Sequence, residues 1–526
     1  MSRKESLVRG AVALALAGLI IKLSNLLVRL PLTRLIGSEG LGIYQMALPA
    51  FNALLHLAAG GVPVAVQNLV AEYTERRRRA VADRVLRLAL LYALLAGGAA
   101  TCLLLAGAPL LARLLGDPRA YQPLVAVAPA VLLFALDAIY RNYLQGRKVI
   151  TPSAAASILE QGTKVLVTLG AAWLLLPLGR EYAAAGAALG ITGGAVVSLG
   201  YMIWAVRRIR TEDREEPEPA ALPTGLGRRM LQLAWPVTVG SITLPLLNVV
   251  DVGIVQQGFR KAGYTLAEAT SLYGAYSGIA VQVVWFPFVL TNALANATVP
   301  TLTAAQARGD RAAVRERVLM GLRAASLICL PVAMGAMILA APIVRLFGEP
   351  LATEPLRYMG PVALLGPLTW MTVAQLQALG ETAAPMRNLG LAMAVKLVLD
   401  ALLAPIRGVD VLGVAAASVV MFLLCVWLNG RTLARLLGEP LPWGRLLMGP
   451  LVASLVMGAG VAGLLAATGG SFGQWEALLA ALATAPFLYV GALIATRSLT
   501  RSELLGLAGP LAPRLERWLM VIWPWS

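Results

Sequence analysis

The first apolar segment of the chain carries three polar side chains with helical spacing. Lys22, Asn25 and Arg29 stand at i, i+3 and i+7, so a helix presents them on one face. An ionised group in mid-bilayer costs roughly 3 kcal/mol on insertion scales, so such groups normally face protein or water. Because the segment holds no acidic residue, this stripe predicts an anion site in a central cavity. In the alternative, Arg29 reaches the membrane surface and Lys22 pairs with another helix.

A similar pattern recurs on the seventh apolar segment, where an aspartate takes the place of the arginine. Asn25 and Arg29 align with Asn248 and Asp251 at a shift of about 222 residues. Arg29 and Asp251 could therefore face each other from two related halves of the chain. Such a pair would be a gate that forms in one state and breaks in the other, or a permanent buried ion pair.

Two lysines near the middle of predicted spans each have an acid one helical turn away. Lys164 follows Glu160 by four residues, and Lys396 precedes Asp400 by the same spacing. Pairing within the helix lowers the cost of burying both charges. These residues are candidates for a gate or for ion coupling, and a structural role or substrate contact remains open. The same spacing recurs near the cytoplasmic end of another span, where we expect a surface pair, Asp137 and Arg141.

The second apolar segment holds the single histidine of the chain. His56 follows Asn52 by one helical turn and precedes Gly60, Gly61 and Pro63, which are typical of a broken helix. Since histidine titrates near neutral pH, His56 is a candidate for proton coupling. The alternative is a histidine that only satisfies local hydrogen bonds.

The eighth segment resembles the second in its prolines. Pro287 and Pro300 echo Pro49 and Pro63, and three amide side chains accompany them: Gln282, Asn292 and Asn296. Polar-lined, broken helices at corresponding positions of two halves are the expected marker of a transport path. Pro31 is likewise predicted to break or kink the first helix.

The sequence contains no motif for catalysis or for a cofactor. A Walker A loop, a G-x-S-x-G stretch and a metal-spaced cluster of His and Cys are all absent. Cys102, Cys329 and Cys425 lie far apart in apolar runs, which disfavours a disulfide, metal or redox role. We therefore expect a protein that is not an enzyme and that holds no metal or cofactor.

The composition predicts an integral membrane protein. Hydrophobic residues make up 58% of the 526 residues and charged residues 13%, against roughly 25% charge in soluble domains. The net charge of +17 comes from basic residues in short loops between apolar runs, which fits the positive-inside rule better than a nucleic-acid partner. The loop charges predict a multi-pass protein of the cytoplasmic membrane with both termini in the cytoplasm.

The apolar runs predict about 14 helical spans, each long enough for a bilayer core of about 30 Å. They lie at 10–35, 41–70, 82–112, 121–144, 153–178, 183–206, 229–257, 272–300, 313–346, 358–380, 386–406, 411–436, 445–468 and 475–496. Residues 113–118 and 345–350 share a pattern at a shift of about 232 residues, and Lys164 and Lys396 repeat at the same shift. We expect two parallel six-helix lobes at 1–206 and 229–436, a cytoplasmic linker at 207–228, a helix pair at 445–496 and an interfacial cytoplasmic helix at 501–526.

The sequence resembles the multidrug/oligosaccharidyl-lipid/polysaccharide (MOP) exporter superfamily. Within it the chain is similar to the group of stage V sporulation protein B and polysaccharide biosynthesis proteins, which are related to MurJ-type lipid II flippases. Similarity extends over essentially all predicted spans. The stretches that carry the resemblance are RLPLTRLIGSEGLGIYQ at 29–45, GVPVAV at 61–66, LQGR at 144–147 before Pro152, and KLVLD at 396–400.

The resemblance implies a V-shaped pair of lobes and alternating access that moves an undecaprenyl-pyrophosphate-linked oligosaccharide outward, for peptidoglycan, spore cortex or polysaccharide assembly. It assigns Lys22, Arg29 and Arg34 to the cavity, whereas the cavity arginine of MurJ-type helix 8 has no counterpart here. H⁺, Na⁺ or the membrane potential would drive transport, with cell-wall synthesis proteins as possible partners. The first rival is an ion-coupled multidrug antiporter of the same superfamily, and the second is a non-transporting scaffold for cell-wall synthases.

Overall fold

The computed structural model describes residues 3–212, 225–468, 474–496 and 498. Side chains are described in the same ranges except at 3–27, 210–212, 289, 468 and 474. The side chains of Lys22 and Asn25 therefore lie outside the described residues, as do the predicted interfacial helix at 501–526 and most of the predicted linker at 207–228.

Within these ranges the chain is helical throughout and contains no strand. Ten helices are long and apolar enough to cross a membrane, which confirms the all-α membrane class. The predicted count of about 14 spans is not confirmed. In the described part of the chain, residues 28–75 form one candidate where two spans were predicted, and no candidate lies within the predicted spans 272–300, 358–380 and 386–406.

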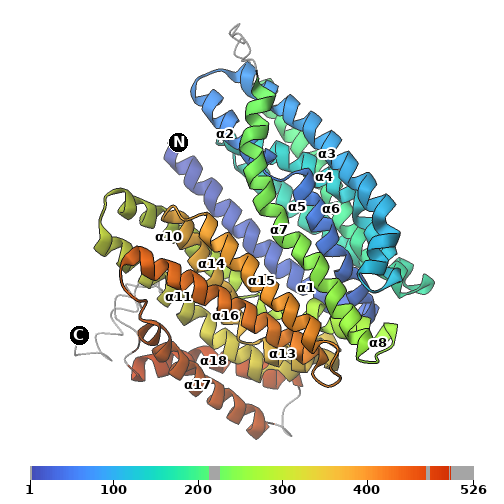
Figure 1. Cartoon of the computed structure of the whole chain (residues 1–526), viewed down its shortest axis with the longest axis vertical. Helices are drawn as coiled ribbons and strands as arrows, with labels where there is room; N and C mark the ends of the chain where they lie inside the picture. Colours follow the sequence, from blue (N-terminus) through green and yellow to red (C-terminus); the bar gives the residue numbers. More distant parts are fainter. Residues whose placement is uncertain (1–2, 213–224, 469–473, 497, 499–526) are drawn as a thin grey trace. The chain divides into compact units, whose positions relative to one another are not determined.

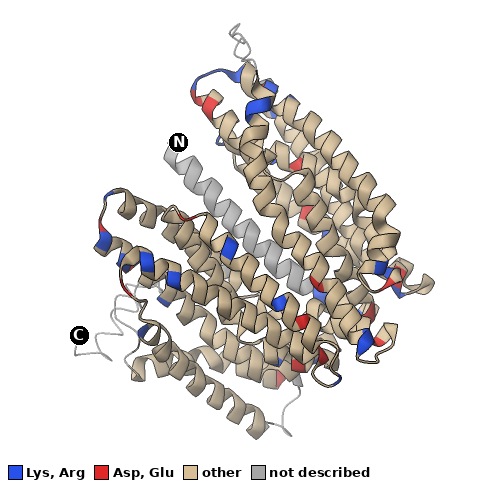
Figure 2. Cartoon of the chain, viewed as in Figure 1, with Lys and Arg blue, Asp and Glu red and all other residues tan. Residues whose placement is uncertain are grey.

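The helices divide into two compact units. The first unit holds residues 1–289, 344–359 and 386–425, and the second holds 290–343, 360–385 and 426–526. The predicted boundaries of two six-helix lobes stay a prediction. Among the coloured residues, most Lys, Arg, Asp and Glu lie toward the ends of the helices, and the stretches between them are mainly uncharged (Figure 2).

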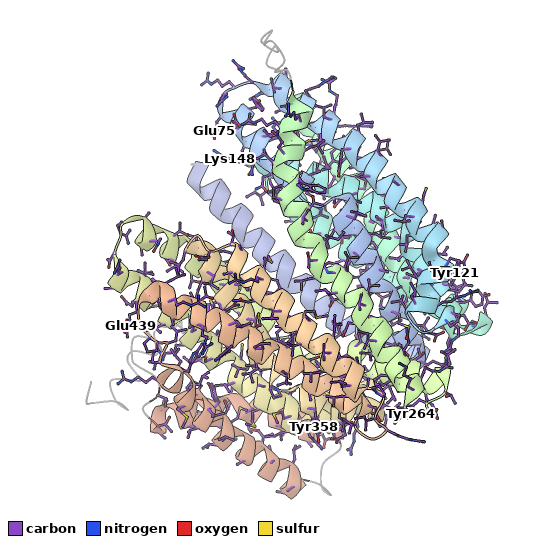
Figure 3. All side chains as sticks on the ribbon, viewed as in Figure 1. Glu75, Tyr121, Lys148, Tyr264, Tyr358 and Glu439 are labelled. Atoms are coloured by element: carbon purple, nitrogen blue, oxygen red, sulfur yellow. The ribbon has the colours of Figure 1, made fainter. Side chains whose placement is uncertain are left out.

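The first unit begins with α1 (Arg3–Ala58), α2 (Val62–Glu75), α3 (Arg79–Leu114), α4 (Tyr121–Gly146), α5 (Thr151–Leu175) and α6 (Arg180–Glu212). Helices α3, α4, α5 and α6 pack side by side (Figure 1), and α1 packs against α4, α5 and α6. The bounds of α3, α4, α5 and α6 agree with the predicted spans to within a few residues. Helix α1 instead continues through the loop predicted between 35 and 41 and ends at Ala58, inside the predicted span 41–70. At one end of this group, Glu75 forms an ion pair with Lys148 (Figure 3).

The sharp break in α1 lies at Gly37 rather than at Pro31, where it was predicted. Gly37 has φ 69° and ψ 177°, whereas the helix continues through Pro31 and Pro49. Proline fixes φ near −65°, which suits a helix, but a positive φ is readily adopted only by glycine. The break therefore occurs at the residue that tolerates the required backbone conformation.

The unit continues with α7 (Leu226–Lys261) and a helix in several pieces. These are α8 (Leu266–Tyr273), a π-helix, η3 (Gly274–Ala280), and α9 (Val281–Val284), with a turn at 285–287 before α10 (Phe288–Ala307). Breaks thus occur near Pro287 and, between α1 and α2, just before Pro63, where the prolines predicted them. A capping box between Thr265 and Glu268 begins α8.

Later segments complete the first unit. They are α13 (Thr353–Met359), most of α15 (Ala383–Leu403) and the first part of α16 (Asp410–Leu437). Glycines allow α1 to approach η3 closely: a Cβ on Gly274 would lie 1.9 Å from the Ser38 carbonyl oxygen, and one on Gly278 would lie 2.4 Å from Leu41 Cδ2. A larger residue at Gly274 would therefore require a shift of the backbone, and one at Gly278 a shift of the Leu41 side chain.

The second unit contains α10, α11 (Arg311–Ile338), α14 (Val362–Ala378), α17 (Trp443–Thr468) and α18 (Gln474–Ala495), with the end of α16. The short helix α12 (Ala340–Phe347) lies across the boundary of the two units. The apolar core of the second unit includes Val318, Leu322, Leu368, Met371 and Leu433. Inside it, Gln375 donates to the Val318 carbonyl (3.1 Å) and Asn429 to Thr372 (3.0 Å), so both amide nitrogens are hydrogen-bonded, whereas Gln375 Oε1 has no partner among the described residues.

We expect Gly274→Ala to destabilise the protein by roughly 1–3 kcal/mol, because its methyl group would overlap the Ser38 carbonyl. Thermal unfolding of the purified protein in detergent measures this effect. Gly98→Ala is the matched control, since a Cβ there meets nothing within 4 Å. Equal melting temperatures for the two variants would contradict the close approach of α1 and η3.

Candidate functional site

The first unit encloses a cavity of about 560 Å³ between helices from both halves of the sequence. Helices α1, α7, α8, α9, α13, α15 and α16 and the π-helix η3 contribute to its wall. Its polar lining residues are Gln45, Asn52, His56, Asn248, Asp251, Tyr273, Tyr276, Ser277, Lys396 and Ser418. Its apolar lining includes Pro49, Trp285, Met393, Met421 and Phe422. A volume in the range of about 300–1,000 Å³ is typical of sites for small organic molecules.

A buried cluster of three charged groups forms part of this wall. Lys396 Nζ lies 2.5 Å from Asp251 Oδ1 and 2.7 Å from Asp400 Oδ2. The side chains of Lys396 and Asp400 are 6% and 0% exposed, and that of Asp251 is 16% exposed. The i, i+4 pair predicted from the sequence is therefore present, and Asp251 of α7 joins it.

The cluster leaves one carboxylate oxygen without a partner. Asp400 Oδ1 is buried and has no hydrogen-bond partner among the described residues. Two carboxylates face one ammonium, so the three groups carry an excess of one negative charge when all are ionised. An unsatisfied oxygen in a site removed from solvent is costly, which makes Asp400 Oδ1 a suitable place for a proton.

The π-helix η3 brings hydroxyl groups to the same wall. Tyr276 and Ser418 are hydrogen-bonded at 2.8 Å, and Gln45 Nε2 donates to the Ser277 carbonyl at 2.9 Å. A π-helical turn is wider than an α-helical turn and is frequent at functional sites. Sequence reasoning missed Tyr273, Tyr276, Ser277 and Ser418. No spacing signal in the sequence marks the π-helix that carries Tyr276 and Ser277.

A second cavity, of about 320 Å³, adjoins the first because Leu48 and Asn52 line both. Lys164 and Tyr44 also line it, and the Arg29 guanidinium carbon lies 5.9 Å from the centroid of the Tyr44 ring. Two residues predicted from the sequence, Arg29 and Lys164, thus approach one cavity. The hypothesised partner of Arg29, Asp251, instead accepts a hydrogen bond from Lys396.

A third cavity, of about 350 Å³, shares His56 with the first and Leu55 and Phe134 with the second. Asp137, Arg141 and Glu160 line it. Arg141 lies 2.5 Å from Asp137 and 2.9 Å from Glu160. The expectation of a surface pair is wrong here, because α5 and α6 cover it: the side chains of Asp137 and Arg141 are 3% and 16% exposed.

The two charge clusters differ in their central cation. Arg141 also donates to the Ser153 carbonyl, to Ser157 Oγ and to Ser198 Oγ, so its guanidinium is fully used in joining α4, α5 and α6. In the Lys396 cluster, by contrast, Asp400 Oδ1 has no partner among the described residues. The Arg141 cluster is therefore suited to a structural role, and the Lys396 cluster, through Asp400, is suited to proton transfer.

Other residues predicted for the site lie elsewhere. Arg34 is exposed and its Nε donates to the Leu346 carbonyl at 3.0 Å, so it is not a lining residue of these cavities. Gln282, Asn292 and Asn296 are exposed and likewise do not line the three cavities.

The sequence matches two models of protein families. The model described as "Polysaccharide biosynthesis protein" matches residues 7–306, more than half of the chain, and the MatE model matches residues 274–402. The chain is 29% identical over 445 residues to stage V sporulation protein B of Bacillus subtilis (strain 168), covering 82% of this chain and 85% of that protein.

Solved structures share the fold. The lipid II flippase MurJ in an inward closed conformation superposes with a TM-score of 0.70 at 15% identity, covering 94% of this chain and 100% of MurJ. A multidrug resistance MATE family transporter of the MOP superfamily, in an inward-facing conformation, gives 0.67 at 17% identity, covering 81% of this chain and 99% of that one. These likenesses show that the chain shares the helical fold of these two structures.

Removal of the Lys396 charge should leave buried carboxylates without a counter-ion. We expect Lys396→Met to lower the free energy of unfolding by roughly 3–5 kcal/mol, the usual cost of breaking one side of a buried ion pair. Thermal or denaturant unfolding in detergent measures the loss.

The matched experiment combines Lys396→Met with Asp251→Asn and Asp400→Asn. The triple variant should recover part of the lost stability, since no net charge then remains in the cluster. Purely additive losses would show that the three groups are not coupled.

Proposed function

We propose that this chain, which belongs to the polysaccharide biosynthesis protein family of the MOP superfamily, is a flippase for a polyprenyl-pyrophosphate-linked oligosaccharide. The named function of MurJ and the name of the sporulation relative support this choice. We place the protein in the cytoplasmic membrane with both termini in the cytoplasm, on the basis of its basic loops.

The observation that carries the proposal is the chemistry of the adjoining cavities. Lys164, with Arg29 close to the same wall, provides positive charge for a pyrophosphate. Gln45, Asn52, Asn248 and Ser277 provide neutral hydrogen-bonding groups of the kind that sugar hydroxyls require. The substrate would thus lie with its anionic group toward Lys164 and its sugar in the larger cavity.

Aromatic side chains support the placement of the sugar. The rings of Trp285 and Phe422 lie edge to face with centroids 5.7 Å apart, and both line the larger cavity. Aromatic rings combine a large apolar surface with rigidity, which suits the apolar faces of sugar rings. Trp285 also contacts Phe288, so its ring is held in place by neighbours.

The multidrug antiporter remains the second candidate, because the MatE model matches residues 274–402. An antiporter for cationic drugs needs a carboxylate that is open to the drug. In the described part of the cavities, however, Asp251 and Asp400 bind Lys396, and Asp137 and Glu160 bind Arg141. The acids are thus engaged by cations of the protein, which favours an anionic substrate.

We further propose that the Asp251, Lys396 and Asp400 cluster couples transport to an ion gradient. Neutral Asp400 leaves one carboxylate for one ammonium, and loss of its proton leaves an excess negative charge beside the cavity. The two states differ by one charge, so the proton would favour one conformation over the other. Lys22, Asn25 and His56 stay candidates for the substrate path and for proton transfer.

Removal of the positive charge near the second cavity should weaken transport. We expect Arg29→Ala and Lys164→Ala each to lower the rate at which a fluorescent polyprenyl-pyrophosphate oligosaccharide crosses reconstituted liposomes, by roughly tenfold or more. Arg84→Ala, an exposed change of equal charge on α3, is the control and should transport normally.

Drug efflux is measured in the same variants. If Arg29→Ala and Lys164→Ala leave oligosaccharide movement intact while drug efflux falls, the antiporter is the correct function. If the native protein moves no polyprenyl-linked sugar and no drug, a non-transporting scaffold for cell-wall synthases is the better description.

Coupling is tested by Asp400→Asn. We expect this variant to keep substrate movement in the absence of a gradient and to lose its acceleration by an imposed proton gradient, because the amide cannot exchange a proton. Glu354→Gln, an exposed change on α13, is the control. Acceleration by the gradient that persists in Asp400→Asn would rule out Asp400 as the coupling group.

A further inference from the structure

The sequence landmarks that revealed the duplication also adopt the same local structure. Asp117 and Glu349 each follow a glycine with positive φ, Gly116 at 93° and Gly348 at 76°. Each acid then begins a short 3₁₀-helix that starts with proline, η1 (Pro118–Ala120) and η4 (Pro350–Ala352). The two acids are thus equivalent positions of the two repeats, in backbone conformation as well as in sequence.

Each of these acids binds the opposite half of the sequence. Thr270 Oγ1 of α8, in the second half, donates to Asp117 Oδ2 at 2.8 Å. In return, the Ser38 backbone N–H, in the first half, donates to Glu349 Oε1 at 2.7 Å. Ser38 follows the break in α1 at Gly37, and Thr270 stands near the start of the broken helix that begins with α8.

The two contacts are therefore reciprocal. Equivalent acids, which follow the third span of each half, reach the beginning of the second span of the other half. All four residues belong to the first unit, so the contacts are part of one compact body. A pair of contacts related in this way must form and break together when two parallel repeats move against each other.

Neighbouring groups hold the acids in place. Arg119 binds Asp117 through Nη2 at 2.9 Å and Glu39 through Nη1 at 2.5 Å, and Arg180 also pairs with Glu39. On the other side, Arg34 donates to the Leu346 carbonyl, three residues before Glu349. Asp117 is fully buried, so its partner Thr270 contacts a carboxylate that water does not reach.

We propose that Asp117 and Glu349 are a matched pair of gate residues that hold the two repeats together at the extracellular ends of their helices. The proposal rests on the proposed function, because release of the substrate outward requires these ends to separate, and on the orientation that the basic loops predict. We call the two contacts, Asp117 with Thr270 and Glu349 with Ser38, the latch. Arg34 supports this latch through its hydrogen bond to the Leu346 carbonyl and does not belong to the anion site. Opening toward the outside breaks both contacts, and their loss by substitution favours the open state.

The test measures access to the larger cavity from outside the membrane. The native cysteines are first replaced, and Asn248→Cys, which lines that cavity, supplies one thiol. A membrane-impermeant maleimide is added to right-side-out vesicles. Thr270→Val removes the donor to Asp117, and Glu349→Ala removes the acceptor of the Ser38 N–H.

We expect each latch variant to increase the labelling rate roughly fivefold, since loss of one hydrogen bond shifts an equilibrium by about that factor, and the double variant to label faster than either. Two controls make the same kinds of substitution outside the latch. They are Thr243→Val, at a threonine whose hydroxyl donates to a carbonyl of its own helix, and Glu354→Ala, at an exposed glutamate. Labelling at the parent rate in the double variant, or equal acceleration by the controls, would overturn the proposal.

A second measurement guards against poorly folded variants. Ser38→Cys with Glu349→Cys, joined by a short bis-methanethiosulfonate that forms a mixed disulfide with each thiol and releases methanesulfinate, should block access of the maleimide to the cavity until a reductant cleaves the disulfides and is removed. Asn248→Cys alone, given the same reagent and reductant, corrects for capping of the cavity thiol. Unchanged access in the crosslinked protein would also overturn the proposal. Because neither experiment uses a substrate, the latch can be established even if no polyprenyl-linked sugar is transported, and its failure leaves the proposed substrate untouched.

Discussion

The structure depends on how charged groups are neutralised inside an apolar protein. Each half of the chain buries a cation between two carboxylates: Arg141 between Asp137 and Glu160, and Lys396 between Asp251 and Asp400. A buried charge without a partner is far more costly than a buried pair, so these clusters dictate which helix faces must meet. The first joins α4, α5 and α6, and the second joins α7 to α15.

Around these clusters the helices leave room instead of packing fully. Residues of α1 and of the turn into α2, from Tyr44 to Pro63, contribute lining to all three cavities, so one broken helix borders all of them. Neutral amides, hydroxyls and aromatic rings line the largest cavity, while Lys164 lines a smaller one. A cation, neutral hydrogen-bonding groups and the cluster of Asp251, Lys396 and Asp400 thus line adjoining cavities, in keeping with the coupled transport of a lipid-linked sugar proposed above.

Much of this arrangement could be predicted from local sequence. Proline and glycine marked the breaks near Pro63 and Pro287, and the i, i+4 rule marked Lys396 with Asp400, because both signals act within one helix. Asp251 lies 145 residues from Lys396, and only the folded chain shows their contact. The burial of Asp137 and Arg141 depends on serines of α5 and α6, and the break at Gly37 depends on packing that demands a positive φ. Contacts between segments that are distant in the sequence could thus not be predicted from the spacing of residues within one helix.

The glycines between α1 and η3 bring backbone against backbone, with Gly274 directly beside the Ser38 carbonyl. A contact of this kind has no long side chain that could stretch to follow a departing helix. Dispersion attraction weakens by a quarter to a half over a gap of only about 0.5–1 Å, so slight separation already forfeits much of it. A contact surface of this kind therefore favours two states, one with α1 and η3 fully packed and one with them fully separated. Intermediate separations lose most of the contact energy and are disfavoured.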